Sequence, residues 1–181
     1  VSAQLLQYGI RSTSMDDIAA RLGISKKTIY QYFEDKDALV EEIVNNILTE
    51  NECGCENDRL AAENAIHEVM LAMQMMQKMF TAMNPSVLHD LQKYHPKAFI
   101  RFKKHKDQFL LQVLTKNLQR GIKEKLYRPE INVDILARLR VESIILPFNP
   151  AFQLGLKQSL YELQQEILIH FLYGVVTPRG Y

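Results

Sequence analysis

The sequence is poor in the residues and patterns that mark several protein classes. Its 181 residues include no tryptophan, two cysteines, seven glycines and six prolines. No apolar run approaches the roughly 18–20 residues that cross a bilayer, and no secretory leader is legible at the start. So little cysteine is typical of a reducing compartment. We therefore expect a cytoplasmic protein with no membrane partner.

Motifs of catalysis and metal binding are missing as well. The chain has no HExxH, GxSxG, P-loop or Rossmann fingerprint, and its five histidines have no nucleophile or carboxylate partner at a legible spacing. Cys53 and Cys55 are separated only by a glycine, which is a poor geometry for pairing, and a metal site would need further ligands. We expect no enzyme, no cofactor and no metal site. We also expect the polar segment 51–58, which holds both cysteines, to be a loop.

Charge gives no overall sign of a nucleic-acid partner. The chain has 22 basic and 21 acidic residues, a net charge of +1. Residues 1–44 hold five basic and seven acidic residues, a balance of −2, which is unusual for a DNA-binding module. Any affinity for phosphates must therefore come from a local basic cluster, such as Lys26, Lys27 and Lys36, repeated in a dimer.

Apolar residues recur at helical spacing almost everywhere, and no strand pattern is visible. Proline at a first helical position and asparagine or aspartate caps suggest where several helices begin. We expect an all-α protein with helices over about 35–49, 58–83, 85–93, 96–126, 132–146 and 151–174. The first helix lies within residues 2–9.

The densest local signal lies at residues 14–36, SMDDIAARLGISKKTIYQYFEDK. Ser14 and Asp17 have the spacing of a capping box, Gly23 suits a left-handed turn, and Ser25 can cap the next helix. Two short helices around a tight turn, with polar and basic groups on the second, are typical of a helix-turn-helix that reads the DNA major groove. An ordinary helical hairpin with a solvated face has the same spacing.

The segment resembles the TetR/AcrR family of bacterial transcriptional regulators, whose pattern is roughly G-x3-T-[TS]-x3-IA-x2-AGVS-x-GTLY-x-[HY]F-x2-K-x2-L. Leu22 replaces the usual small residue before the glycine, and Lys27 stands where the family often has glycine. The chain opens at Val1, and relatives usually carry several more residues, so the resemblance implies an N-terminus truncated within the first helix. The matching residues are Gly9, Thr13, Ile18, Ala19, Gly23, Ile24, Ser25, Thr28, Ile29, Tyr30, Tyr32, Phe33, Lys36 and Leu39.

The resemblance implies a three-helix DNA-binding domain over 1–44 and a helical ligand-binding and dimerisation domain over 45–181. It also implies that Lys26, Lys27, Thr28 and Gln31 approach bases or the adjoining backbone, because amides suit adenine and lysine suits guanine. Other polar residues would bind phosphates. The candidate DNA-binding residues are Ser14, Ser25, Lys26, Lys27, Thr28, Tyr30, Gln31, Tyr32 and Lys36.

Methionines cluster in the helix expected over 58–83, which is apolar almost all round and typical of a buried central helix. Unbranched thioethers adapt to irregular apolar ligands, so this helix is a candidate pocket wall, although a methionine stripe is more often plain core. The candidate pocket residues are His67, Met70, Met73, Gln74, Met76, Met79, Met83 and Gln112.

The two C-terminal helices have broad apolar faces, and the resemblance assigns them to a dimeric four-helix interface. A dimer would also explain how one short recognition helix reads enough base pairs, because two half-sites are then bound. The candidate interface residues are Ile135, Leu139, Leu156, Leu160, Leu163, Ile167 and Phe171.

These expectations combine into one function. We expect a repressor that binds a palindromic double-stranded DNA operator as a homodimer and releases it when a small apolar effector binds the C-terminal domain. An activator of transcription would have the same residues, so the sequence does not distinguish activation from repression. The alternative is a helical ligand-binding or scaffolding protein whose DNA-binding module is weakened, which the acidic balance of 1–44 favours. The basic run over 97–106 is expected to be a solvated face, with a second nucleic-acid site as the alternative.

Overall fold

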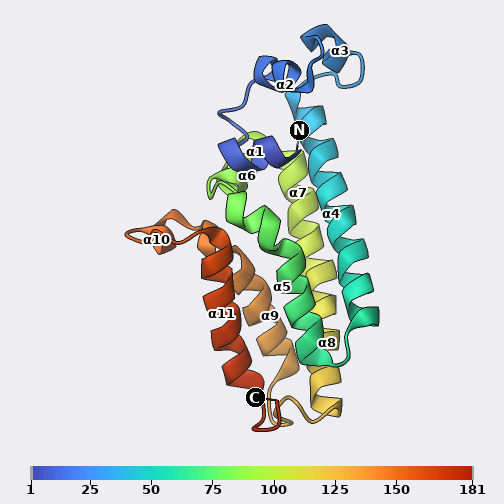
Figure 1. The fold of residues 1–181 in the computed structure, drawn as a ribbon, viewed down its shortest axis with the longest axis vertical. Helices are drawn as coiled ribbons and strands as arrows, with labels where there is room; N and C mark the ends of the chain where they lie inside the picture. The colour runs from blue at the N-terminus through green and yellow to red at the C-terminus, as the bar shows by residue number, and fades with distance from the viewer. Residues whose placement is uncertain (1, 181) are drawn as a thin grey trace.

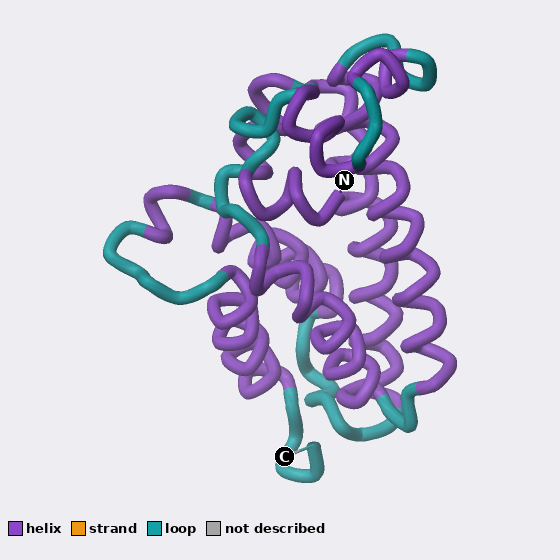
Figure 2. The backbone as a smooth tube through the Cα atoms, turned by 45° about the horizontal axis from the view of Figure 1, so that its top comes forward, coloured by secondary structure: helices purple, strands orange, loops and turns teal. Residues whose placement is uncertain are grey.

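The computed structural model describes residues 2–180, and the chain there is all-α, as predicted (Figure 1). Figure 2 shows helices joined by loops without strands in this part of the chain; one isolated antiparallel bridge pairs Tyr127 with Val176. The expected truncation concerns a segment before Val1, outside the described residues.

The elements are α1 (Ser2–Tyr8), α2 (Met15–Leu22), α3 (Lys26–Tyr30), α4 (Lys36–Ala61), α5 (Ala65–Ala82), α6 (Val87–Tyr94), α7 (Pro96–Lys104), the π-helical segment η1 (His105–Leu110), α8 (Leu111–Lys123), α9 (Val133–Ile145), the 3₁₀ turn η2 (Leu146–Phe148), α10 (Pro150–Gln153) and α11 (Leu160–Val175).

The helices lie in two groups joined by α4 (Figure 1). The short α2 and α3 sit at one end of the molecule, and α5, α8, α9 and α11 form a bundle at the other. Helix α4 begins beside α3 and runs along most of the length, so it touches both groups. No helix within residues 2–180 is both long and apolar enough to cross a membrane.

Two apolar cores correspond to these groups. The first joins α1 to α4 with α6 and α7, through residues such as Leu5, Ile18, Val40 and Leu91. The second is built around Tyr127, which is almost completely buried between α5, α8, α9 and the end of α11. Because the first core includes α6 and α7, the N-terminal helices are packed directly onto the rest of the chain. The division expected after residue 44 falls inside α4 and remains a prediction.

The prediction of a loop over 51–58 was wrong, because α4 continues to Ala61. Gly54 explains how this polar stretch stays helical against α5: a Cβ added there would lie 2.1 Å from Met75 Sδ. The glycine allows a close approach of the two helices. The break comes later, at Asn64, whose side chain accepts hydrogen bonds from the backbone N–H groups of Ile66 and His67 and caps α5.

The prediction of one helix over 151–174 was also wrong in its first third. Helix α10 is a single short turn, and Gly155 adopts a left-handed conformation with φ of 80° before α11 begins at Leu160. Ser159 and Glu162 form a capping box that sets this start. The Ser-x-x-Glu spacing is a known signature of a helix start, so the sequence did contain the signal.

Candidate functional site

The helix-turn-helix is built by local hydrogen bonds, as predicted. The Ser14 side chain accepts from the Asp17 N–H at 3.1 Å, and the Asp17 carboxylate accepts from the Ser14 N–H at 2.8 Å. Gly23 ends α2 in the left-handed region with φ of 67°. Ser25 then caps α3 by accepting from the Thr28 N–H at 3.0 Å. These bonds fix the angle between α2 and α3 and hence the direction in which α3 projects.

Helix α3 buries Ile29, half-buries Thr28 and exposes its other side chains. Ile29 is 4% exposed and anchors the helix to the first core. Tyr32 is 78% exposed, and Tyr30, Gln31 and Lys27 are exposed too. Phenol, amide and ammonium groups on an exposed helix suit phosphate and base contacts.

The two remaining candidate lysines are engaged within the chain. Lys26 Nζ donates to Asp16 Oδ2 at 2.8 Å on the exposed face, and this contact raises the pKa of Lys26. Lys36 is half-buried and donates to the Ile10 carbonyl at 2.6 Å, and burial lowers its pKa. Lys36 therefore ties the loop after α1 to the start of α4, whereas Lys27 remains exposed.

Residues outside the motif join the helix-turn-helix to the body. The buried Asp90 on α6 accepts from the Arg11 N–H at 3.0 Å. At the junction of α6 and α7, His95 Nδ1 lies 2.6 Å from Asp37 Oδ1 on α4. Sequence analysis missed these contacts, because their partners are 58 and 79 residues apart.

The expected solvated face over 97–106 is only partly solvated. Lys97, Lys103 and Lys104 are exposed, but Lys106 is buried and bonded to Glu142 on α9 at 2.5 Å and to Asp107 at 2.8 Å. This lysine therefore holds η1 against α9.

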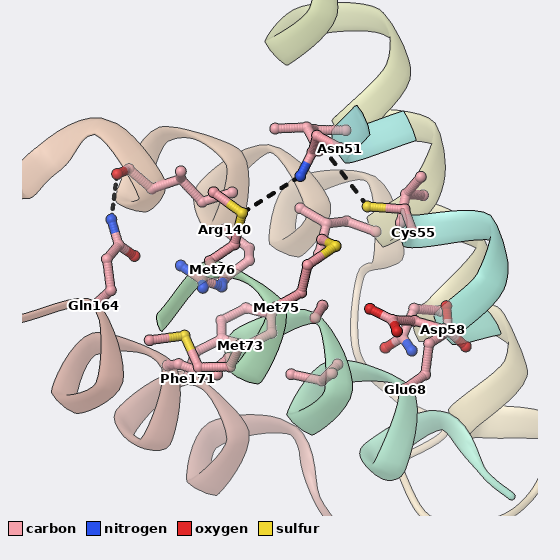
Figure 3. A pocket seen from close by; sticks show the side chains of 18 of the residues that line it. Asn51, Cys55, Asp58, Glu68, Met73, Met75, Met76, Arg140, Gln164 and Phe171 are labelled. Atoms are coloured by element: carbon pink, nitrogen blue, oxygen red, sulfur yellow. Dashed lines mark hydrogen bonds between the residues drawn. The ribbon is translucent and has the colours of Figure 1, made fainter. Parts of the chain in front are cut away.

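A cavity of about 150 Å³ lies inside the helical body (Figure 3). Its wall combines side chains of α4, α5, η1, α8, α9 and α11. An apolar cavity of this size holds a benzene-sized molecule. The lining residues are Asn51, Cys55, Asp58, Glu68, Val69, Ala72, Met73, Met75, Met76, Phe80, Leu110, Val113, Leu114, Asn117, Leu118, Arg140, Ile144, Gln164, Leu168, Phe171 and Leu172.

Of the pocket residues expected from sequence, Met73 and Met76 line this cavity and the others do not. Met70 is 50% exposed, so α5 is not a fully buried helix, and Met83 packs against the first core instead. The missed lining residues on α4, among them Asn51 and Cys55, lie in the stretch expected to be a loop. The residues outside the cavity wall are His67, Met70, Gln74, Met79, Met83 and Gln112.

The cavity has polar groups at both ends (Figure 3). Arg140 and Gln164 lie at one end, and Asp58 and Glu68 lie at the other. Glu68 is paired with Arg120 at 3.0 Å, whereas Asp58 Oδ2 is buried without a hydrogen-bond partner among the described residues. Burial raises the pKa of Asp58 and lowers the pKa of Arg140 to about 10.

Cys55 is the one cysteine that faces the cavity. Burial raises the pKa of its thiol to about 11, so at neutral pH it is an unreactive thiol. Within residues 2–180, no three His, Cys, Asp or Glu side chains are grouped closely enough to hold a metal ion.

The candidate interface residues separate into inward-facing and outward-facing sets. Leu160 is 2% exposed and Leu163 is 8% exposed, so both belong to the interior of the chain. Ile167 and Phe171 are half-buried, and Phe171 lines the cavity. The exposed set on and near α9 and α11 includes four residues missed from sequence, and consists of Ile135, Leu139, Leu146, Leu154, Leu156, Ile169 and Tyr173.

Comparison with known proteins finds similar sequences and similar folds. Residues 2–43 match the bacterial regulatory proteins of the tetR family. Over 172 residues, which cover 93% of this chain and 88% of the relative, the sequence is 28% identical to YvaF of Bacillus subtilis (strain 168), an uncharacterized HTH-type transcriptional regulator.

Solved structures share the fold over nearly the whole chain. A TetR-family transcriptional regulator from Agrobacterium tumefaciens superposes with a TM-score of 0.78 at 15% identity, covering 97% of this chain and 93% of that one. A Saccharomonospora viridis protein solved in complex with choline has a TM-score of 0.70 at 16% identity, with the same coverages of 97% and 93%. The chain therefore carries the N-terminal helix-turn-helix domain of the tetR family of bacterial regulatory proteins, on an all-α fold shared with TetR-family transcriptional regulators.

Proposed function

We propose that this protein is a ligand-responsive repressor, which binds a palindromic operator as a homodimer and leaves it when a small molecule occupies the cavity. The observation that carries the proposal is the path of α4. This helix begins next to α3 and, about four turns later, contributes Asn51, Cys55 and Asp58 to the cavity wall. A molecule in the cavity therefore touches the element that supports the DNA-binding helices.

The contacts between the two groups of helices suggest how a change would reach α3. Asp37 on α4 meets His95, and Asp90 on α6 meets Arg11, so α4, α6 and α7 hold the helix-turn-helix together. A shift of α4 relative to α6 would change the direction of α3. A ligand can drive this change only to the extent that it binds the two arrangements unequally. The Saccharomonospora viridis relative, with choline bound, supports a ligand in a protein of this fold.

The second part of the proposal is a symmetric dimer. Helices α9 and α11 are in contact, and they expose Ile135, Leu139, Ile169 and Tyr173. An apolar set on two adjacent helices suits an isologous interface, in which each copy offers the same surface to the other. Two copies would present two recognition helices to two half-sites. Leu139→Glu should convert the dimer to a monomer in sedimentation equilibrium, whereas Ile100→Glu, on the exposed face of α7, should not.

The regulator is tested by fluorescence anisotropy of the protein with DNA from its own promoter and with random duplex, over a salt titration. A repressor of this kind should prefer the promoter fragment by roughly 10³-fold or more. Its affinity should fall steeply as salt rises, because phosphate contacts release counterions.

Two lysine variants separate the recognition helix from the basic run on α7. Lys27→Ala should weaken binding to all sequences and reduce the salt slope by about 1. Lys103→Ala, which removes another exposed lysine, should change neither quantity. Equal and weak binding to both duplexes at low salt would favour the alternative, a helical ligand-binding protein with a weakened DNA-binding module. Two observations favour this alternative. They are the acidic balance of residues 1–44 and the internal contacts of Lys26 and Lys36.

A further inference from the structure

Arg140 is a buried cation whose charge no side chain of residues 2–180 neutralises. It projects from α9 into the cavity wall and is 7% exposed. Its side chain makes one hydrogen bond in this part of the chain, from Nη1 to Ser143 Oγ at 2.9 Å. No aspartate or glutamate of residues 2–180 lies within 4.0 Å of its guanidinium, although other buried cations such as Lys106 are paired.

This arrangement costs free energy that a ligand would recover. Buried charges in proteins are normally paired with an opposite charge or fully hydrogen-bonded. A guanidinium has five N–H donors in a planar fork, which matches the two oxygens of a carboxylate. Burial lowers the pKa of Arg140 only to about 10, so the group still carries its charge at neutral pH and needs an anion.

Apart from the amides of Gln164 and Asn51, the side chains around Arg140 are mostly apolar. Met73, Met76 and Phe171 line the cavity on the same side as Arg140, away from Asp58 (Figure 3). The neighbouring Gln164 amide already donates to the Ile144 carbonyl, which keeps it in place beside the arginine. The site therefore offers one cationic fork next to thioether and aromatic surface, and it selects a molecule with one anionic end and an apolar body.

We propose that the effector of this cavity is a small apolar carboxylate, whose carboxylate pairs with the Arg140 guanidinium and whose body lies among Met73, Met76 and Phe171. This inference rests on the proposed ligand response and names the chemical class of the ligand.

Asp58 at the opposite end presents the rival chemistry, an ammonium ligand. Its Oδ2 atom is buried and has no hydrogen-bond partner in the described chain. The cost of burying this carboxylate disappears when it takes up a proton, and its raised pKa makes that protonation easier. Arginine cannot lose its charge at physiological pH. Arg140 therefore needs an anion more strongly than Asp58 needs a cation.

The test is calorimetric titration of the purified protein without DNA at pH 7.5, using two matched sets of probes. The first set is hexanoate, hexan-1-ol and hexylammonium, and the second is benzoate and benzyl alcohol. Each carboxylate should bind roughly 10–100-fold more tightly than the alcohol of the same size, the ratio expected for a charged hydrogen-bonded contact. Preference for hexylammonium would overturn the proposal in favour of Asp58, and equal or absent binding of the carboxylates would overturn it outright.

Three variants assign the effect to the guanidinium. Arg140→Met should remove the preference for carboxylate over alcohol and leave alcohol binding intact, which also shows that the cavity is still folded. Arg138→Met removes an exposed arginine of the same helix and should leave the preference unchanged. Arg140→Lys should keep part of it, because the ammonium retains the charge without the fork. An unchanged preference in Arg140→Met would overturn the proposal.

The DNA assay distinguishes failure of this inference from failure of the proposed function. If the carboxylates do not bind but the promoter fragment is still preferred, only the ligand class is wrong. If the carboxylates bind and all duplexes are bound equally, the ligand class stands and the regulator proposal fails.

Discussion

The helix-turn-helix and the helical body use polar side chains in opposite ways. In the first, Ser14 bonds to Asp17 and Ser25 bonds to Thr28, three residues away, on an exposed surface. In the second, Arg120 bonds to Glu68, 52 residues away, in a partly buried site. Local bonds leave side chains such as Lys27 and Tyr30 of α3 exposed to an external partner, whereas long-range bonds hold helices around an internal space.

The two regions also differ in where their polar groups without a hydrogen-bond partner lie. Around α3 they are exposed to solvent. Around the cavity they are buried, as at Asp58 and Arg140, and only a ligand or trapped water can satisfy them. Exposed polar groups determine what α3 can contact, and buried polar groups determine what the cavity can hold.

The largest expected effect on stability is in the body. Arg120 donates to Glu68, Glu124 and the Ala62 carbonyl, so it clamps α8 to the junction of α4 and α5. Arg120→Met leaves Glu68 buried without its cation, which should lower the free energy of unfolding by on the order of 3 kcal/mol. Urea unfolding at a fixed protein concentration measures the change.

The matched control is Arg138→Met, which removes an exposed arginine and should change stability by less than about 0.5 kcal/mol. If the two variants were equally stable, the long-range bonds would not hold the body together, and the contrast between the regions would lose its energetic basis.

The next largest effect is on DNA binding. Gln31 is exposed on the side of α3 opposite the buried Ile29, and an amide suits the adenine edge. Gln31→Ala should cost about 1–3 kcal/mol at a single operator position, measured by anisotropy with a set of operators that differ by one base pair.

Gln92→Ala, an exposed glutamine on α6, should leave every operator unaffected. A uniform loss for Gln31→Ala over all operators would mark Gln31 as a backbone contact instead of a base contact.

Features built by local bonds could be predicted from the sequence, and features built by long-range contacts could not. The caps at Ser14 and Ser25 were predicted and confirmed, because a cap depends on residues within one turn. The all-α class was confirmed for the same reason. The cavity depends on residues from six elements, so the periodicity of α5 alone identified Met73 and Met76 and missed Arg140.

Two further errors show the limit of patterns read along one helix. Helix α11 has an inner apolar stripe through Leu160 and Leu163 and an outer one through Ile169 and Tyr173. Spacing found the inner stripe, but the neighbouring helices, α5 and α9 among them, determine which stripe is covered. The stretch around Gly54 was taken as a loop because it is polar, and the close approach of Met75 that makes the glycine useful there is a property of the packed structure.

A smaller effect is expected from the cap of α2. Ser14→Ala removes a side chain that accepts the Asp17 N–H, and the loss should be about 1 kcal/mol in the free energy of unfolding. Ser86→Ala is the control, because Ser86 occupies the cap position of α6 without a side-chain cap bond. Both are measured by urea unfolding. Equal losses would mean that the Ser14 bond adds nothing beyond the residue's position.

The smallest effect concerns two carboxylates with opposite responses to pH. Hydrogen bonds from the Ser14 side chain and backbone lower the pKa of Asp17 below 3.8, so its contribution is present above pH 3.8 and is lost as pH falls further. Burial raises the pKa of Asp58 above 3.8, so its ionised form opposes folding at neutral pH and this penalty disappears as pH falls towards 3.8. The signs follow from which state binds more protons.

Asp17→Asn and Asp58→Asn therefore serve as each other's control. At pH 7 the first should lower and the second should raise the free energy of unfolding relative to the unmodified chain. Repeating the urea titration between pH 7 and pH 4 should shrink the gain from Asp58→Asn, while the loss from Asp17→Asn persists, because the Asp17 window lies below pH 3.8. If both variants changed stability in the same direction at pH 7, the buried carboxyl at the cavity would be satisfied in solution. The cavity end at Asp58 would then hold a bound water or cation in the ligand-free protein.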